Sequence, residues 1–176
     1  MSITAIQNYV QGLLQGTIGA YNNSPLEAWV DPPTGTASFE TPQAYILDAD
    51  GEGLRQTMGY TSGFYEDVHQ VYVYIQWAFA PGTQNANFAF TNLIDTIITK
   101  IRTSYTGAIF VTDPVTYQQS QLLVIGDKLR WRYLPQESIG DSGQEWLLYT
   151  SQLTFEVKEK SQYVGTTALG GEVSFS

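Results

Sequence analysis

The chain has 176 residues, of which 43% are hydrophobic, so it is long enough and apolar enough for one domain with a buried core. It has no cysteine and a single histidine, which excludes disulfides, thiol nucleophiles, and metal sites built from thiolates or several imidazoles. Its formal net charge of −9 opposes binding to nucleic acid phosphates and to anionic membranes.

The amino-terminal segment MSITAIQNYVQGLLQG predicts a short helix over residues 3–14, because its apolar side chains recur at helical spacing and Ser2 suits the N-cap. It lacks the positive start and the unbroken apolar stretch of a secretory signal. No segment of the chain has the roughly 20 apolar residues that span a bilayer. We therefore expect a soluble chain made without a cleaved targeting sequence.

Residues 16–42 are rich in turn-forming residues and predict a long irregular segment, held to the body by Trp29 and Phe39. This part of the chain is acidic, since no lysine or arginine occurs before Arg55, whereas six acidic residues do. The segment AYILD that follows predicts a strand near residues 44–48.

The stretch ILDADGEGLRQTMGY places Asp48, Asp50 and Glu52 at the spacing of the first half of an EF-hand calcium loop. The twelfth loop position is Gly59, which has no side-chain oxygen, and the residues ahead of the motif predict a strand where an EF-hand has a helix. We therefore expect a glycine-rich turn between strands. Its three carboxylates would be solvated or would face something outside the chain.

Residues 69–79 alternate between apolar and polar side chains, which predicts a half-buried strand with Tyr72 and Tyr74 on its polar face. Tyrosines in polar surroundings are common at protein interfaces, although an ordinary half-exposed strand gives the same pattern. Residues 87–105 predict a long amphipathic helix, because isoleucine and phenylalanine recur along one stripe.

Residues 128–134 and 145–160 predict two strands joined by a hairpin loop. The polar face of the first strand carries a ladder of three basic residues, which are Lys128, Arg130 and Arg132. Trp131 lies on the opposite face by alternation, which argues against a groove that stacks nucleic acid bases. The ladder would pair with Glu156 across the hairpin, or it would meet an acidic surface on another copy of the chain.

The order of elements predicts an α+β fold, in which an antiparallel-rich sheet carries a short amino-terminal helix and one long amphipathic helix on one face. We expect a single domain over residues 1–160. Residues 161–176 are expected to form a flexible carboxy-terminal tail, although the segment EVSFS could add a strand to a neighbour.

No motif in the sequence predicts catalysis. The segment GYTSGF does not match the G-x-S-x-G nucleophile elbow, and there is no phosphate-binding glycine motif. His69, the one imidazole, is more simply explained as a structural or surface residue. We therefore expect no catalytic, cofactor-binding or metal-binding residues. A small carbohydrate-binding or hydrolytic domain that uses Trp29, Trp131 or Trp146 with a carboxylate pair is an alternative.

Taken together, these elements resemble the tail terminator, or tail-completion, family of long-tailed bacteriophages. The resemblance covers residues 1–160 and is carried by the order of the elements and by four segments: WVDPPTG, TPQAYIL, FTNLIDTIITKIRTSY and QEWLLYTSQLTFEVKEK. It implies a non-enzymatic structural protein of the virion tail or neck, assembled in the host cytoplasm. Such a protein forms a ring, usually a hexamer, that caps the tail tube and joins it to the head connector.

The resemblance also implies partners and surfaces. The basic ladder, with Tyr72 and Tyr74, would form the subunit interface. The predicted turn at residues 48–53, with Asp48, Asp50 and Glu52, would face the lumen or a partner. Genomic DNA would pass through the lumen without specific binding, because an acidic channel repels phosphates. A neck or head–tail connector protein is a neighbouring hypothesis. A tail-tube subunit is another, and it would polymerise into long tubes.

Overall fold

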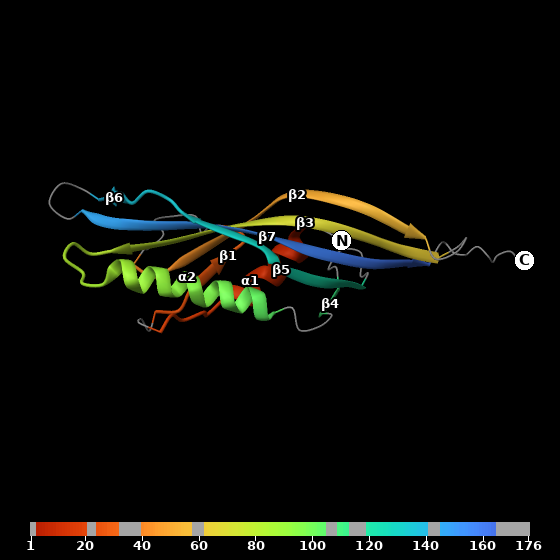
Figure 1. Ribbon diagram of the computed structural model, residues 1–176, viewed down its shortest axis with the longest axis horizontal. Helices are drawn as coiled ribbons and strands as arrows, with labels where there is room; N and C mark the ends of the chain where they lie inside the picture. The colour runs from red at the N-terminus through yellow and green to blue at the C-terminus, as the bar shows by residue number, and fades with distance from the viewer. Residues whose placement is uncertain are drawn as a thin grey trace, which may run out of the picture.

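A computed structural model of the protein describes residues 3–20, 24–31, 40–57, 62–104, 109–112, 119–140 and 145–164. Two helices cover one face of a seven-stranded sheet, and the molecule is elongated along the strands (Figure 1). In chain order the elements are α1 (Ile3–Leu14), β1 (Glu27–Trp29), β2 (Gln43–Thr57), β3 (Ser62–Phe79), α2 (Ala86–Thr103), β4 (Ile109–Thr112), β5 (Gln119–Tyr133), β6 (Glu137–Ile139) and β7 (Trp146–Val164).

The sheet has the strand order β1-β2-β3-β7-β5-β4, and β6 continues beside β7 beyond the end of β5. The pair β1–β2 is parallel, and every other pair among the described strands is antiparallel. The longest pairing joins β3 to β7, from Ser62 opposite Val164 to Phe79 opposite Leu147. The predicted α+β class is therefore confirmed.

Both helices form where the sequence predicts them. The apolar stripe of α2 is buried against the sheet, and its members are Phe90, Leu93, Ile94, Ile97, Ile98 and Ile101. The helix is rich in β-branched residues, so packing rather than intrinsic propensity holds it helical. No described helix is long and apolar enough to cross a bilayer.

The alternation predicted for residues 69–79 is confirmed in β3. Val71, Val73 and Ile75 are fully buried under the helices, whereas Tyr72 and Tyr74 on the other side are partly exposed. Because successive residues of a strand point to opposite faces, the helix-covered core and the uncovered face are fixed by the same pattern.

The predicted turn at residues 48–53 is wrong, because β2 runs through it without a break. The strand contains a bulge at this point: Asp48 lies opposite Val71, and Asp50 lies opposite Gln70. Pairing with the long strand β3 supplies the backbone hydrogen bonds here, and a bulge accommodates the extra residue that the local sequence makes look like a turn. The side chains of Asp48, Asp50 and Glu52 lie outside the described part.

Several strands are longer or more numerous than the sequence predicts. The strand β7 continues to Val164, so the first residues of the predicted tail belong to the sheet, and residues 165–176 lie outside the described part. The strand β1 forms within the predicted irregular segment, and β6 forms within the predicted hairpin loop. Figure 1 shows β2, β3, β5 and β7 running well past the end of α2.

The segment after α1 is fastened to both helices and to β1. The Thr17 hydroxyl donates to the Leu14 carbonyl oxygen at 2.7 Å and accepts from Lys100 Nζ on α2 at 3.1 Å. The backbone then closes around it, since Leu26 N donates to the Thr17 carbonyl oxygen at 2.9 Å. These bonds hold β1 in place as the first strand of the sheet.

Truncation of the α2 stripe tests this packing. We expect Ile97→Ala to lower the free energy of unfolding by about 2–5 kcal/mol, because the fully buried side chain would leave a cavity. The matched control is Thr99→Ala, at an exposed position two residues along the same helix, which should change it by about 0.5 kcal/mol or less. Equal losses for the two variants in urea unfolding would contradict the described face of α2.

Candidate functional site

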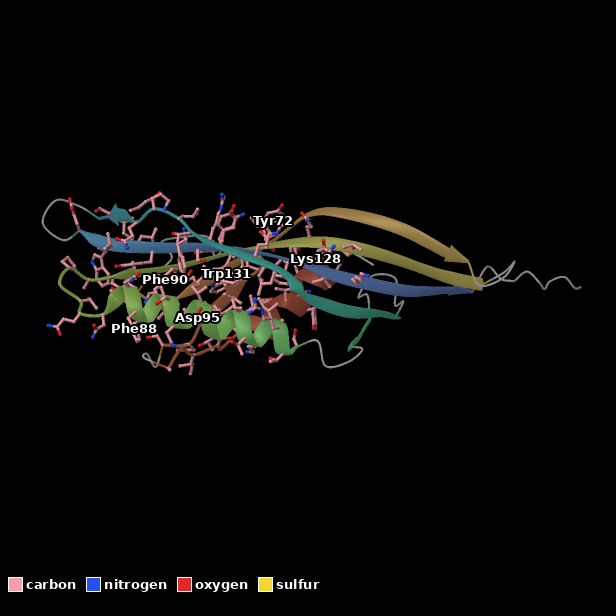
Figure 2. The ribbon with its side chains drawn as sticks, viewed as in Figure 1. Tyr72, Phe88, Phe90, Asp95, Lys128 and Trp131 are labelled. Atoms are coloured by element: carbon pink, nitrogen blue, oxygen red, sulfur yellow. The ribbon has the colours of Figure 1, made fainter. Side chains whose placement is uncertain are left out.

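The face of the sheet opposite the helices is the candidate site, and we call it the open face. It is lined by the outward side chains of four neighbouring strands. They are Gln43, Tyr45 and Leu47 on β2; Gln70, Tyr72, Tyr74 and Gln76 on β3; Thr150, Gln152, Thr154 and Glu156 on β7; and Lys128, Arg130 and Arg132 on β5. Figure 2 shows Tyr72 on the side of the sheet away from α2, whereas Phe90 lies between α2 and the sheet.

Residues of the open face form rows across the strands. In one row Tyr45 lies opposite Tyr74, Tyr74 opposite Gln152, and Gln152 opposite Arg132. This row therefore runs from an aromatic side chain on β2 to a cationic side chain on β5.

The next row has the same character. Leu47 lies opposite Tyr72, Tyr72 opposite Thr154, and Thr154 opposite Arg130. Leu47 is 47% exposed, which places an apolar side chain in solvent at the β2 end of this row. A surface that combines tyrosine, arginine and an exposed leucine has the composition of the core of a protein interface.

Two of the three bases are engaged within the chain. Lys128 Nζ lies 3.1 Å from Glu156 Oε2 in a salt bridge, as the sequence predicts for the ladder. Arg132 Nε donates to Gln152 Oε1 at 2.7 Å. Because these bonds lie along the sheet surface, they keep the two side chains flat against the open face.

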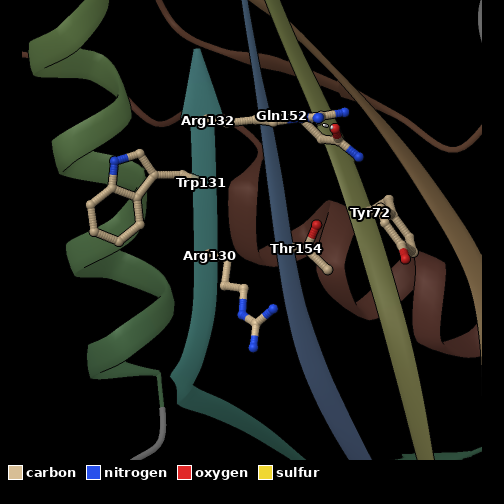
Figure 3. A pocket seen from close by; sticks show the side chains of 6 residues that line it. All are labelled: Tyr72, Arg130, Trp131, Arg132, Gln152 and Thr154. Carbon is tan, nitrogen blue, oxygen red and sulfur yellow. Dashed lines mark hydrogen bonds between the residues drawn. The ribbon is translucent and has the colours of Figure 1, made fainter. Parts of the chain in front are cut away.

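Arg130 differs from its neighbours. Its guanidinium has no hydrogen bond or ion pair with any residue that the structure describes, and it lines two adjoining depressions of about 300 and 440 Å³. Tyr72 and Thr154 border both depressions (Figure 3). Glu156 also borders the larger depression, where it pairs with Lys128. Arg130, which has no described partner, is suited to receive an anionic group from outside the chain.

The other face of β5 turns toward α2. Figure 3 shows Trp131 pointing to the helix, away from the other residues around the smaller depression. The Arg102 guanidinium lies 5.6 Å from the centre of the Trp131 ring, at the distance of a cation–π contact. Trp131 is nevertheless 43% exposed, so the outer side of β5 combines an exposed ring with two arginines. The predicted separation of Trp131 from Arg130 and Arg132 is confirmed.

At the opposite side of the sheet the surroundings are acidic. The structure places Glu27 in β1 beside Tyr45, whose pKa is raised above its ordinary value of 10.0, first by burial and then by the charge of the Glu27 carboxylate. Asp31 is exposed just after β1, and Glu40 is exposed just before β2. The open face thus lies between an acidic side and a basic side.

The structure brings together all five residues that the sequence analysis assigns to an interface, since Tyr72, Tyr74, Lys128, Arg130 and Arg132 share the open face. Sequence reasoning missed Tyr45, Leu47, Gln152 and Thr154. Alternation within β7 could have identified the last two residues, because they are in phase with Glu156. The first two required the register of β2 against β3, which no local pattern specifies.

The three tryptophans of the carbohydrate hypothesis are not gathered in one place. Trp29 lies in β1 and Trp131 in β5, and three strands separate them in the sheet. Trp146 pairs with Ile139 at the β6–β7 end. The three rings therefore form no shared platform, and the hypothesis of one exposed tryptophan beside a carboxylate pair stays a prediction.

Within the described ranges, no group of three or more His, Asp or Glu residues could hold a metal ion.

Comparison of the sequence with protein-family models and with curated proteins finds no match in either case. The function is therefore argued from the residues and geometry of this chain.

The pKa of Tyr45 provides a test of the acidic side. We expect Glu27→Gln to lower this pKa, because a nearby carboxylate opposes formation of the tyrosinate, although burial should still keep it above 10.0. In the wild type, the stability due to neutral Tyr45 is present below pH 10.0 and is lost as the pH rises through the raised pKa. NMR titration of the Tyr45 ring measures the shift. Asp31→Asn is the control, and an unchanged Tyr45 pKa in Glu27→Gln would contradict the described contact.

Proposed function

We propose that the protein is a structural component of a bacteriophage tail, a tail terminator that forms a ring of identical subunits through its open face. The observation that carries the proposal is the composition of that face, on which exposed tyrosines adjoin a basic strip whose Arg130 lacks a described partner. The resemblance to that family rests on the element order predicted from the sequence, to which the structure adds the short strands β1, β4 and β6.

A second copy of the chain is the partner that the charges favour. The protein carries a net charge of −9, yet three of its eight bases lie in one strip on β5. An acidic surface on a neighbouring copy would complement this strip, whereas the remaining acidic surface would repel nonspecific anionic partners. A contact between two different surfaces of identical subunits closes into a ring when the rotation between them allows it.

In this role the chain needs no catalytic residue. The ring would cap the tail tube, stop its growth and present a surface to the head connector protein. Genomic DNA would pass through the lumen without specific binding, because the acidic chain repels phosphates. A neck protein would share the ring but contact the connector side. A tube subunit would continue into long tubes.

Removal of the two tyrosines tests the interface. We expect Tyr72→Ala/Tyr74→Ala to weaken self-association by about thirtyfold or more, because interface tyrosines at a central position each contribute on the order of 1–2 kcal/mol. Native mass spectrometry over a range of concentrations gives the subunit number, and negative-stain images separate closed rings from long tubes.

The matched control is Ile18→Ala/Phe88→Ala, which removes two exposed apolar side chains, 49% and 53% exposed, that lie outside the open face. This control should assemble like the wild type. A wild-type chain that stays monomeric at every concentration contradicts the proposed function. Long tubes in place of rings would assign the chain to the tube subunits.

A further inference from the structure

The two long sides of the sheet differ in charge. The β5 side carries most of the described cations and one nearby acid, Asp95 of α2, which after burial is the second cause of the raised pKa of Tyr133. On the β1 side, the structure describes Glu27 in β1 and an exposed Asp31 just after it. On the β5 side, Arg102 at the end of α2 adds its charge to the basic ladder. Because β1 and β5 are separated by β2, β3 and β7, the two charged sides face away from one another within a single molecule.

The outer edge of β5 has no neighbouring strand, among the described residues, at the positions of its basic residues. The strand β4 pairs only with the stretch Gln119–Leu122 of β5, so the edge beyond it has no strand partner in the described part of the chain. An unpaired edge leaves backbone donors and acceptors available, and proteins usually cover or charge such edges. Here the edge carries an exposed ring, that of Trp131, and a large aromatic side chain often anchors an interface.

Two cations at this edge are available to a partner. Lys128 and Arg132 are held by Glu156 and Gln152, as described above. Arg130 has no described partner, and the described contact of Arg102 is with the Trp131 ring. We call Arg102, Arg130 and Trp131 the basic edge.

The opposite side offers matching anions on a fixed backbone. Glu27 lies in β1 and Asp31 is exposed just after it. Glu40 is exposed just before β2, where its carbonyl oxygen accepts a hydrogen bond from Trp77 Nε1 at 3.1 Å. Glu27 N donates to the Pro42 carbonyl oxygen at 2.9 Å, and Gln11 Nε2 on α1 donates to the Ala28 carbonyl oxygen at 2.8 Å. We call Glu27, Asp31 and Glu40 the acidic edge.

We infer that the acidic edge of one subunit binds the basic edge of the next and extends over the part of the open face where Arg130 and Tyr72 line the same depressions. The inference rests on the proposed function and adds to it the surface of the neighbour that completes the contact. Arg130 and Arg102 on either side of Trp131 receive carboxylates from the neighbour's β1 side, and the exposed ring is covered in the process. The contact joins two different surfaces, as ring closure requires.

A charge-swap experiment tests this pairing. The variant Arg102→Glu/Arg130→Glu has two acidic edges, and the variant Asp31→Lys/Glu40→Lys has two basic edges. Each variant alone should self-associate at least about tenfold more weakly than the wild type, because like charges then meet at every contact. An equimolar mixture should recover rings with alternating subunits, since every contact again joins opposite charges.

The equimolar mixture of the two variants also tests whether each variant is folded, because two misfolded variants could not form rings together. The matched control is Glu137→Lys/Glu145→Lys, which reverses two exposed carboxylates elsewhere and should assemble alone like the wild type. Analytical ultracentrifugation and native mass spectrometry measure the association. Wild-type rings that neither swap weakens would overturn the edge pairing and leave the proposed function standing. Two weakened variants that fail to assemble when mixed would also overturn it. A wild-type protein that does not self-associate at any concentration would contradict the proposed function itself.

Discussion

The pairing of β3 with β7 is the constraint on which the rest of the structure depends. These two strands are in register from Ser62 to Phe79, and their inward residues meet both helices. Once that inward face is buried, alternation turns every second side chain to the uncovered side. The core and the open face are therefore two results of one register. A shift of β3 by a single residue would bury Tyr72 and expose Val71, Val73 and Ile75.

The open face is unlike an ordinary polar face of a sheet. Rows of tyrosine and glutamine end at arginines, and Leu47 and Trp131 remain exposed at its two sides. Hydrogen bonds along the sheet, such as that from Arg132 to Gln152, order the side chains before any partner binds, which lowers the entropy cost of association. Arg130 is the exception, because none of the residues that the structure describes pairs with its guanidinium, which is therefore suited to an anionic partner.

Much of this arrangement could be predicted from the sequence, and the failures have a common cause. Strong periodicity identified α1, α2 and the faces of β3, and it placed Trp131 opposite Arg130 and Arg132. The segment at Asp48 misled because its glycines and carboxylates suit a turn, whereas pairing with β3 carries the strand through it by means of a bulge. The strands β1 and β6 are short, and they form because a longer strand provides an edge. The local sequence of a short strand does not show that such an edge lies beside it.

The most direct test of the account is covalent labelling of tyrosine and phenylalanine side chains in dilute protein and in the assembled form, read by mass spectrometry. The account predicts that labelling of Tyr72 and Tyr74 falls on assembly, because a second copy covers the open face, while Phe88 outside that face is labelled equally in both. If Tyr72 and Tyr74 were labelled equally in both forms, the open face would remain in solvent, and it could not be the surface through which the subunits join.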